Sequence, residues 1–237
     1  MSQKISSSNQ GHSDIAYVPL DLPKIKLSFN HFLKKCYQPK PTDNSYCQGF
    51  WWVPLRTPSI EIENFVERQY DASLKWKWTQ EAIADFPEIK NYMETHLPFN
   101  ELYSACILNS QRDIGAHRDD YDANYPKANI LGEPSCYRIL LSPHQSDTGI
   151  YLSPTENLSD TIGFLKNDEY KKNIILPENV STFVMNDSLF CHGSNWKAEK
   201  LVVYITGEID LKRHQEILKR SQKKFKSFVV SKNDMGV

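Results

Sequence analysis

The sequence lacks an apolar run long enough to cross a bilayer, because no hydrophobic stretch approaches the roughly 18 residues that a membrane helix needs. It also lacks an excess of positive charge, since 28 Lys and Arg residues almost balance 29 Asp and Glu residues and leave a net charge of −1. A protein that binds nucleic acid through its phosphates normally shows a clear basic excess. These absences argue against a membrane-spanning protein and against a nucleic-acid partner.

Cysteine is scarce, and its five positions form no recognisable pattern. The number is odd, and no two cysteines have the C-x-x-C spacing typical of zinc or redox sites. Such usage is typical of reduced, buried thiols in an intracellular protein. Residues 1–14 are rich in Ser, Gln and Asn and lack the apolar core of a secretion signal. We therefore expect a cytoplasmic protein whose N-terminus is disordered.

The 237 residues divide into four segments that differ in composition and in expected secondary structure. They are a disordered N-terminus (1–14), a mixed and largely helical N-terminal elaboration (15–100), a strand-rich core (101–210), and a C-terminal helix and tail (211–237). In the core, seven short runs are expected to be strands in addition to the stretch 114–121 discussed below. They are 102–108, 136–141, 148–152, 173–176, 181–185, 188–192 and 201–209. Many short strands separated by turns are typical of an antiparallel sandwich or barrel. The predicted fold class is therefore mainly β with flanking helices.

Helical periodicity covers residues 59–97, and a further helix is expected near 30–36. Thr79 can cap a short helix, and Pro87 suits the first position of the next one. In that second helix the apolar residues fall on one side at helical spacing. They are Ile89, Tyr92, Met93 and Leu97. We interpret this helix as a packing element without chemistry.

A candidate metal site begins in the stretch 114–121. His117 and Asp119 are two residues apart, and on an extended strand they point to the same side because side chains alternate with period two. An imidazole nitrogen and a carboxylate oxygen can then meet at one ion. Two His and one carboxylate form the facial triad of non-haem Fe(II) sites, which leaves open positions on the metal. His192, near the start of another expected strand, can supply the third ligand.

This His-x-Asp motif followed at long range by a His resembles the Fe(II)- and 2-oxoglutarate-dependent oxygenases, nearest to their aspartyl/asparaginyl β-hydroxylase and proline-hydroxylase-like branch. The resemblance covers about residues 100–215. It implies a double-stranded β-helix core, a jelly-roll, cupin-like fold, with His117, Asp119 and His192 as the iron ligands. It also implies an enzyme that uses Fe(II), 2-oxoglutarate and O₂, releases succinate and CO₂, and hydroxylates an unactivated C–H bond. The substrate is then an amino acid, either free, carrier-bound or within a peptide.

The same resemblance suggests which residues bind the co-substrate. Lys200 opens an expected strand where the family usually has an Arg that grips the 5-carboxylate of 2-oxoglutarate. Arg138 resembles the Arg of an Arg-Ile-His strand, with Leu140 in place of that His. Ser104 lies on a strand where the family often has a Ser in contact with the co-substrate. Related halogenases replace the metal-binding carboxylate with a small residue, so Asp119 favours hydroxylation.

Four residues are candidates for substrate binding. Arg118 faces away from the metal by alternation, but at the pocket rim it can meet a substrate carboxylate. Asp120 and Asp122, in the following loop, can meet an amino group. Trp52 belongs to a Trp-Trp pair that either lines the substrate pocket or packs in the core.

Two other classes of protein remain open at this point. One is a non-catalytic jelly-roll binding protein that keeps the metal residues as a relic. The other is a cupin-type metal dioxygenase that does not use 2-oxoglutarate, for which Arg138 and Lys200 would have no required role. Formation of succinate from 2-oxoglutarate separates these classes. Specificity is expected to depend on the loops 120–134 and 153–172, which do not identify the substrate.

Overall fold

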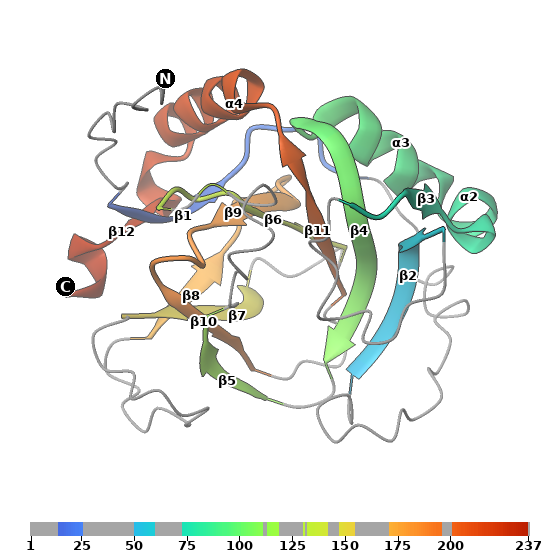
Figure 1. Cartoon of the computed structure of the whole chain (residues 1–237). Helices are drawn as coiled ribbons and strands as arrows, with labels where there is room; N and C mark the ends of the chain where they lie inside the picture. The colour runs from blue at the N-terminus through green and yellow to red at the C-terminus, as the bar shows by residue number, and fades with distance from the viewer. Residues whose placement is uncertain are drawn as a thin grey trace, which may run out of the picture.

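The computed structural model describes most of the expected core and parts of the N-terminal segment. It covers residues 14–25, 50–59, 73–110, 113–118, 130, 132–141, 147–154, 171–195 and 201–236. Residues 1–13 and the expected helix near 30–36 lie outside these ranges. Among the described residues, strands predominate and form two antiparallel sheets (Figure 1). The mainly β fold class is therefore confirmed.

The larger sheet has eight strands and the smaller has four, counted over the described ranges. In spatial order the large sheet consists of β12 (Val230–Ser231), β1 (Ile15–Pro19), β9 (Thr182–Met185), β6 (Cys136–Leu140), β11 (Val202–Ile209), β4 (Phe99–Ser110), β2 (Phe50–Pro58) and β3 (Trp76–Trp78). The small sheet consists of β5 (Ile114–His117), β10 (Cys191–Ser194), β7 (Asp147–Ser153) and β8 (Lys172–Ile175). The strands β1, β2 and β3 thus join the described parts of the N-terminal segment to the same sheet as the core.

The pairing of the strands from β4 to β11 is nested. β4 pairs with β11, β5 with β10, β6 with β9 and β7 with β8. A long antiparallel ribbon that folds across two sheets produces this pattern. As a result β5 and β10, which lie far apart in the sequence, are neighbours in the small sheet (Figure 1).

Two elements differ from the sequence-based expectation. Trp76–Trp78 forms β3 inside the stretch expected to be helical, where it pairs with β2. Its Trp-Lys-Trp alternation has the period of a strand, with Trp76 buried and Lys77 exposed. β10 begins at Cys191 rather than at residue 188, because a turn precedes it in which the Phe190 amide donates to the Asn186 carbonyl (3.0 Å).

Alternate residues of the large sheet pack on opposite sides. On β6, Ile139 belongs to the cluster that contains the helices, whereas Cys136 and Leu140 pack with Ile150 and Leu152 of the small sheet. The side of β6 that carries Cys136 and Leu140 therefore faces the small sheet. We call the space between the two sheets the sandwich interior. The helices cover the other side of the large sheet (Figure 1).

The helices begin at the expected caps. Thr79 accepts a hydrogen bond from the Ala82 amide (3.0 Å) at the start of α2 (Gln80–Asp85), and Pro87 is the first residue of α3 (Pro87–His96). Within the described ranges, the remaining helical elements are α4 (Leu211–Lys224) and two 3-10 turns, η4 (Lys226–Phe228) and η5 (Asn233–Met235). Across the part of the chain that the structure describes, no helix has the length and apolar character to cross a membrane.

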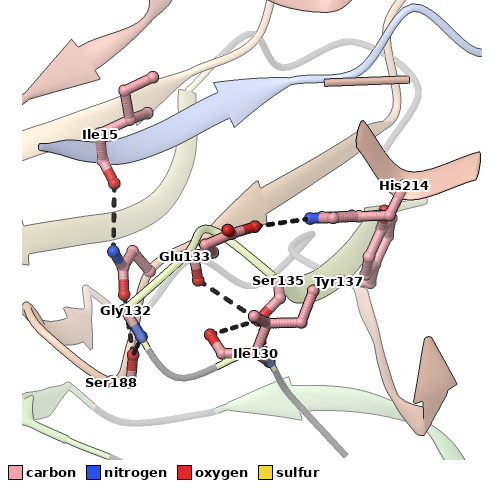
Figure 2. Close-up of polar contacts among 9 residues, drawn as sticks. Ile15, Ile130, Gly132, Glu133, Ser135, Tyr137, Ser188 and His214 are labelled. Atoms are coloured by element: carbon pink, nitrogen blue, oxygen red, sulfur yellow. Dashed lines mark hydrogen bonds and ion pairs between the residues drawn. The ribbon is translucent and has the colours of Figure 1, made fainter. Parts of the chain in front are cut away.

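Side-chain hydrogen bonds hold the segment that leads into β6 (Figure 2). The Ile130 amide donates to Ser135 Oγ (2.8 Å), and the Gly132 amide donates to Ser188 Oγ (3.0 Å). The Ser188 hydroxyl in turn donates to Asn186 Oδ1 (2.9 Å). The segment before β6 is therefore hydrogen-bonded to the turn that precedes β10, so the starts of the two strands are held together.

A fully buried histidine packs against this segment from α4 (Figure 2). His214 Nδ1 lies 2.6 Å from the Tyr137 hydroxyl, and Nε2 lies 3.9 Å from Glu133 Oε2. Burial lowers the pKa of His214 to about 4, because the apolar surroundings disfavour the charged imidazolium. His214 is therefore neutral at pH 7 and has a packing role.

Candidate functional site

The small sheet brings His117 and His192 together. They are directly opposite each other on β5 and β10, although 74 residues (192 − 117 − 1) separate them in the sequence. His192 is also opposite Leu152 on β7, and Leu152 packs in the sandwich interior. Because directly opposite residues share a face of a sheet, both imidazoles point toward the interior. The two strands that the sequence suggested for the metal site therefore present their histidines on one face.

The two rings are close, and one of them has a defined tautomer. The ring centroids are 4.6 Å apart with an angle of 46° between the planes. His192 is 5% exposed, and His117 is half-buried. Nδ1 of His117 lies 2.9 Å from the Gly115 carbonyl oxygen. A carbonyl can only accept, so Nδ1 donates its hydrogen, and in the neutral imidazole Nε2 then holds the lone pair that a metal requires.

This geometry fits a pair of metal ligands. Two imidazoles at adjacent octahedral positions have centroids about 4.5 Å apart, taking metal–nitrogen bonds of about 2.1 Å and a nitrogen about 1.1 Å from the ring centre. The observed separation agrees with this value. A histidine ligand also commonly donates its second ring nitrogen to a backbone carbonyl, as His117 does. The donor set present is therefore suited to a divalent transition metal.

The expected carboxylate ligand lies outside the described residues. Asp119 follows His117 by two positions, and the described residues after β5 end at Arg118. Among the described residues there is no group of three His, Cys, Asp or Glu side chains able to hold a metal. The described part of the site is thus the histidine pair alone.

Arg138 places a guanidinium in the sandwich interior from the opposite sheet. It lies on β6 between Cys136 and Leu140, whose side chains face the small sheet, and it is 3% exposed. Its Cζ lies 4.0 Å from the centre of the Tyr204 ring, and Nη1 donates to the Tyr137 carbonyl (3.0 Å). Stacking on an aromatic ring holds an arginine in one orientation and offsets part of the cost of burial.

Arg138, Tyr204 and Cys106 form a row across three neighbouring strands. Tyr204 on β11 is opposite Arg138 on one side and Cys106 of β4 on the other. Burial raises the pKa of Cys106 to about 12, and the positive charge of Arg138 opposes part of that rise. The thiol is therefore protonated at neutral pH and contributes no charge to the row. The only charge in this row is the guanidinium.

Ser104 is also buried, with its backbone in contact with β11. The Ser104 amide donates to the Thr206 hydroxyl (3.2 Å). This hydrogen bond fixes the strand near Ser104. The other co-substrate candidate, Lys200, lies outside the described residues.

The substrate candidates are placed only in part. Arg118 is exposed, and its charge acts on Cys191, which packs with Tyr151 on the face of the small sheet opposite to His192. This agrees with the alternation along the strand, which predicted that Arg118 points away from the His117 face. Trp52 lies on β2 opposite Leu108, and its side chain lies outside the description. Asp120 and Asp122, with the two expected specificity loops, also fall outside it, apart from a few residues at the loop ends.

Sequence reasoning assigned no site role to Tyr204 or Tyr151. Tyr204 stacks on Arg138, and the signal for it was its place on an expected strand that follows Lys200. The Tyr151 side chain lies against Gly193 on the strand that carries His192, and no local pattern in the sequence marks Tyr151. Both contacts depend on strand pairing over long sequence distances.

The fold and the site define a class of protein: a two-sheet antiparallel β-protein with a histidine pair and an arginine in the space between its sheets. No protein-family model matched the chain, and no curated protein proved similar to it.

Proposed function

We propose that the eight strands from β4 to β11 form a double-stranded β-helix. Support comes from the nested pairing, in which the first strand pairs with the eighth, the second with the seventh, the third with the sixth and the fourth with the fifth. A jelly roll of eight strands arranged as two Greek keys has such a pairing. β1, β2, β3 and β12 extend the large sheet at its edges.

On this fold we infer a mononuclear Fe(II) centre held by His117, His192 and Asp119. The observation that carries the proposal is the cross-strand histidine pair, with ring centroids 4.6 Å apart and the His117 tautomer fixed by the Gly115 carbonyl. Two imidazoles and one carboxylate are the ligand set that leaves one face of the iron open. Asp119 is the carboxylate nearest in sequence on the same alternation as His117.

The co-substrate proposed for this centre is 2-oxoglutarate. Arg138 supports it, because a guanidinium in the sandwich interior suits a dicarboxylate far better than an apolar ligand. Arginine binds a carboxylate through two parallel hydrogen bonds, and the stacked Tyr204 ring holds it ready to do so. Lys200 and Ser104 are the further proposed contacts to the co-substrate.

The proposed reaction is hydroxylation of an unactivated C–H bond of an amino acid, free, carrier-bound or within a peptide. When bound, iron with 2-oxoglutarate and O₂ supplies the oxidising chemistry, and succinate and CO₂ leave as by-products. The chain contributes the metal ligands, a cation for the co-substrate and an interior from which water is largely excluded. Such a protein is proposed to act in the cytoplasm.

The test is oxygen incorporation. Purified protein is incubated with Fe(II), 2-oxoglutarate and air together with a panel of free amino acids and peptides, and products are analysed by mass spectrometry. The proposal expects one panel member to gain one oxygen atom only when 2-oxoglutarate is present. Oxygen gain that is independent of 2-oxoglutarate would instead indicate the cupin-type dioxygenase.

A further inference from the structure

Tyr151 lies directly against the strand that carries His192. A Cβ atom placed on Gly193 of β10 would be 2.4 Å from both Cζ and the hydroxyl oxygen of Tyr151. It would also be 2.6 Å from the Ile114 carbonyl oxygen of β5. Only glycine leaves room for this approach, so the residue after His192 must lack a side chain.

The Tyr151 hydroxyl reaches over β10 to its neighbour. It donates a hydrogen bond to the Ile114 carbonyl oxygen at 3.0 Å. Tyr151 belongs to β7 and Ile114 to β5, and these strands are separated by β10 in the sheet. The tyrosine therefore ties together two strands that do not pair with each other.

The hydrogen bond from Tyr151 to Ile114 lies beside an irregularity in the backbone pairing of β5 and β10. β5 is an edge strand of four residues, and within the described chain β10 is the strand it pairs with. The register between them shifts between His192 and Ser194, beside Ile114. A short edge strand with an irregular ladder has few interactions to fix its position. The hydroxyl of Tyr151 contributes one at the end of β5 opposite to His117.

Other contacts hold the ring of Tyr151 in place. It packs with Ala116 of β5 and Cys191 of β10 on the outward face of the small sheet. Lys171 Nζ lies 4.7 Å from the ring centre on that face. The ring is 4% exposed, so its hydroxyl has little freedom to move away from Ile114.

We propose that Tyr151 is a positioning residue for the metal centre, which holds β5 so that His117 stays opposite His192, and that Gly193 is the glycine which permits it. This inference rests on the proposed function for its metal. The tyrosine itself touches neither the metal nor the substrate, since its ring lies on the other face of the sheet. Residues that orient a metal ligand typically change metal affinity about 10- to 100-fold when they are replaced.

The test uses Tyr151→Phe, which keeps the ring and removes only the hydroxyl. The matched control is Tyr17→Phe. Tyr17 is also buried and donates to a backbone carbonyl, that of Ile175 (2.9 Å), on β8 at the other edge of the same sheet. Two readouts apply to each variant of the full chain: amide hydrogen exchange of β5 in the metal-free protein, and the dissociation constant for Co(II) followed by its visible absorption.

Tyr151→Phe is expected to increase the exchange of β5 amides and to weaken Co(II) binding about tenfold, whereas Tyr17→Phe leaves both close to wild type. Unchanged β5 exchange in Tyr151→Phe overturns the positioning role, whether or not the wild type binds Co(II). Equal loss of Co(II) affinity in both variants also overturns it, because the effect is then general destabilisation. If the wild type binds no Co(II) while β5 exchange still rises selectively, the metal proposal fails and the positioning of β5 stands.

Discussion

The buried His214 predicts a loss of stability in mild acid whose size follows from its surroundings. Its pKa is lowered to about 4 in the folded chain, against an ordinary value of 6.5 in the unfolded chain. As the pH falls through 6.5, the unfolded chain binds a proton first, and the equilibrium shifts toward unfolding. The loss therefore accumulates between pH 6.5 and about 4, and is absent above that range.

The magnitude can be worked from these two values. The full difference corresponds to about 3 kcal/mol, of which about 2 kcal/mol is lost by pH 5. Glu133 opposes this loss, since its carboxylate lies 3.9 Å from Nε2 and favours the charged imidazolium. Tyr137, the other titratable contact, stays protonated throughout because burial raises its pKa well above its usual value. Burial is the larger effect on His214, so the sign of the prediction is set by desolvation.

The assay is urea unfolding of the wild type, His214→Gln and His96→Gln at pH 7.5 and pH 5. Glutamine can replace the hydrogen bond to Tyr137 and does not titrate in this range. His214→Gln should lose about 2 kcal/mol less than the wild type between the two pH values. His96→Gln, which removes a partly exposed histidine from α3, should behave like the wild type. Equal losses in the wild type and His214→Gln would show that protonation of His214 does not cause the loss of stability.

Three further predictions concern the site and the fold. Lys200→Ala and Arg138→Ala should each raise the apparent Michaelis constant for 2-oxoglutarate about 10- to 100-fold, because each removes a charge-assisted contact of about 1.5–3 kcal/mol. Succinate formation measured at varied 2-oxoglutarate concentration shows which of the two residues binds the co-substrate more strongly. Gly193→Ala should lower the melting temperature, because the added methyl collides with the Tyr151 ring, and differential scanning calorimetry checks it against the wild type. Thr79→Ala should reduce the free energy of unfolding by about 1 kcal/mol in urea titration, since it removes the α2 cap, while a change below about 0.2 kcal/mol would contradict the capping role.

Local patterns in the sequence predicted local structure well. Thr79 and Pro87 mark the starts of α2 and α3 because capping depends on residues a few positions apart. Alternation placed Arg118 away from the His117 face for a similarly local reason. The strand Trp76–Trp78 was missed, because three residues give too short a pattern against a helical background.

Contacts between strands that lie far apart in the sequence were harder to predict from the sequence. The motif suggested that His117 and His192 meet, and their direct cross-strand pairing follows from the nested ribbon rather than from either strand alone. The stacking of Arg138 on Tyr204 and the tie from Tyr151 to Ile114 depend on register between strands. Register is set by packing of whole faces, which a single sequence does not reveal.

The decisive measurement for the proposed iron centre is Fe(II)-dependent succinate formation from 2-oxoglutarate in the wild type, His117→Ala and His192→Ala, with His96→Ala as the control histidine. We expect succinate from the wild type and from His96→Ala only when Fe(II) and air are present, and none from the two site variants. Circular dichroism should show that all four proteins are folded. Succinate formation by His192→Ala at the wild-type rate would contradict the proposed metal centre.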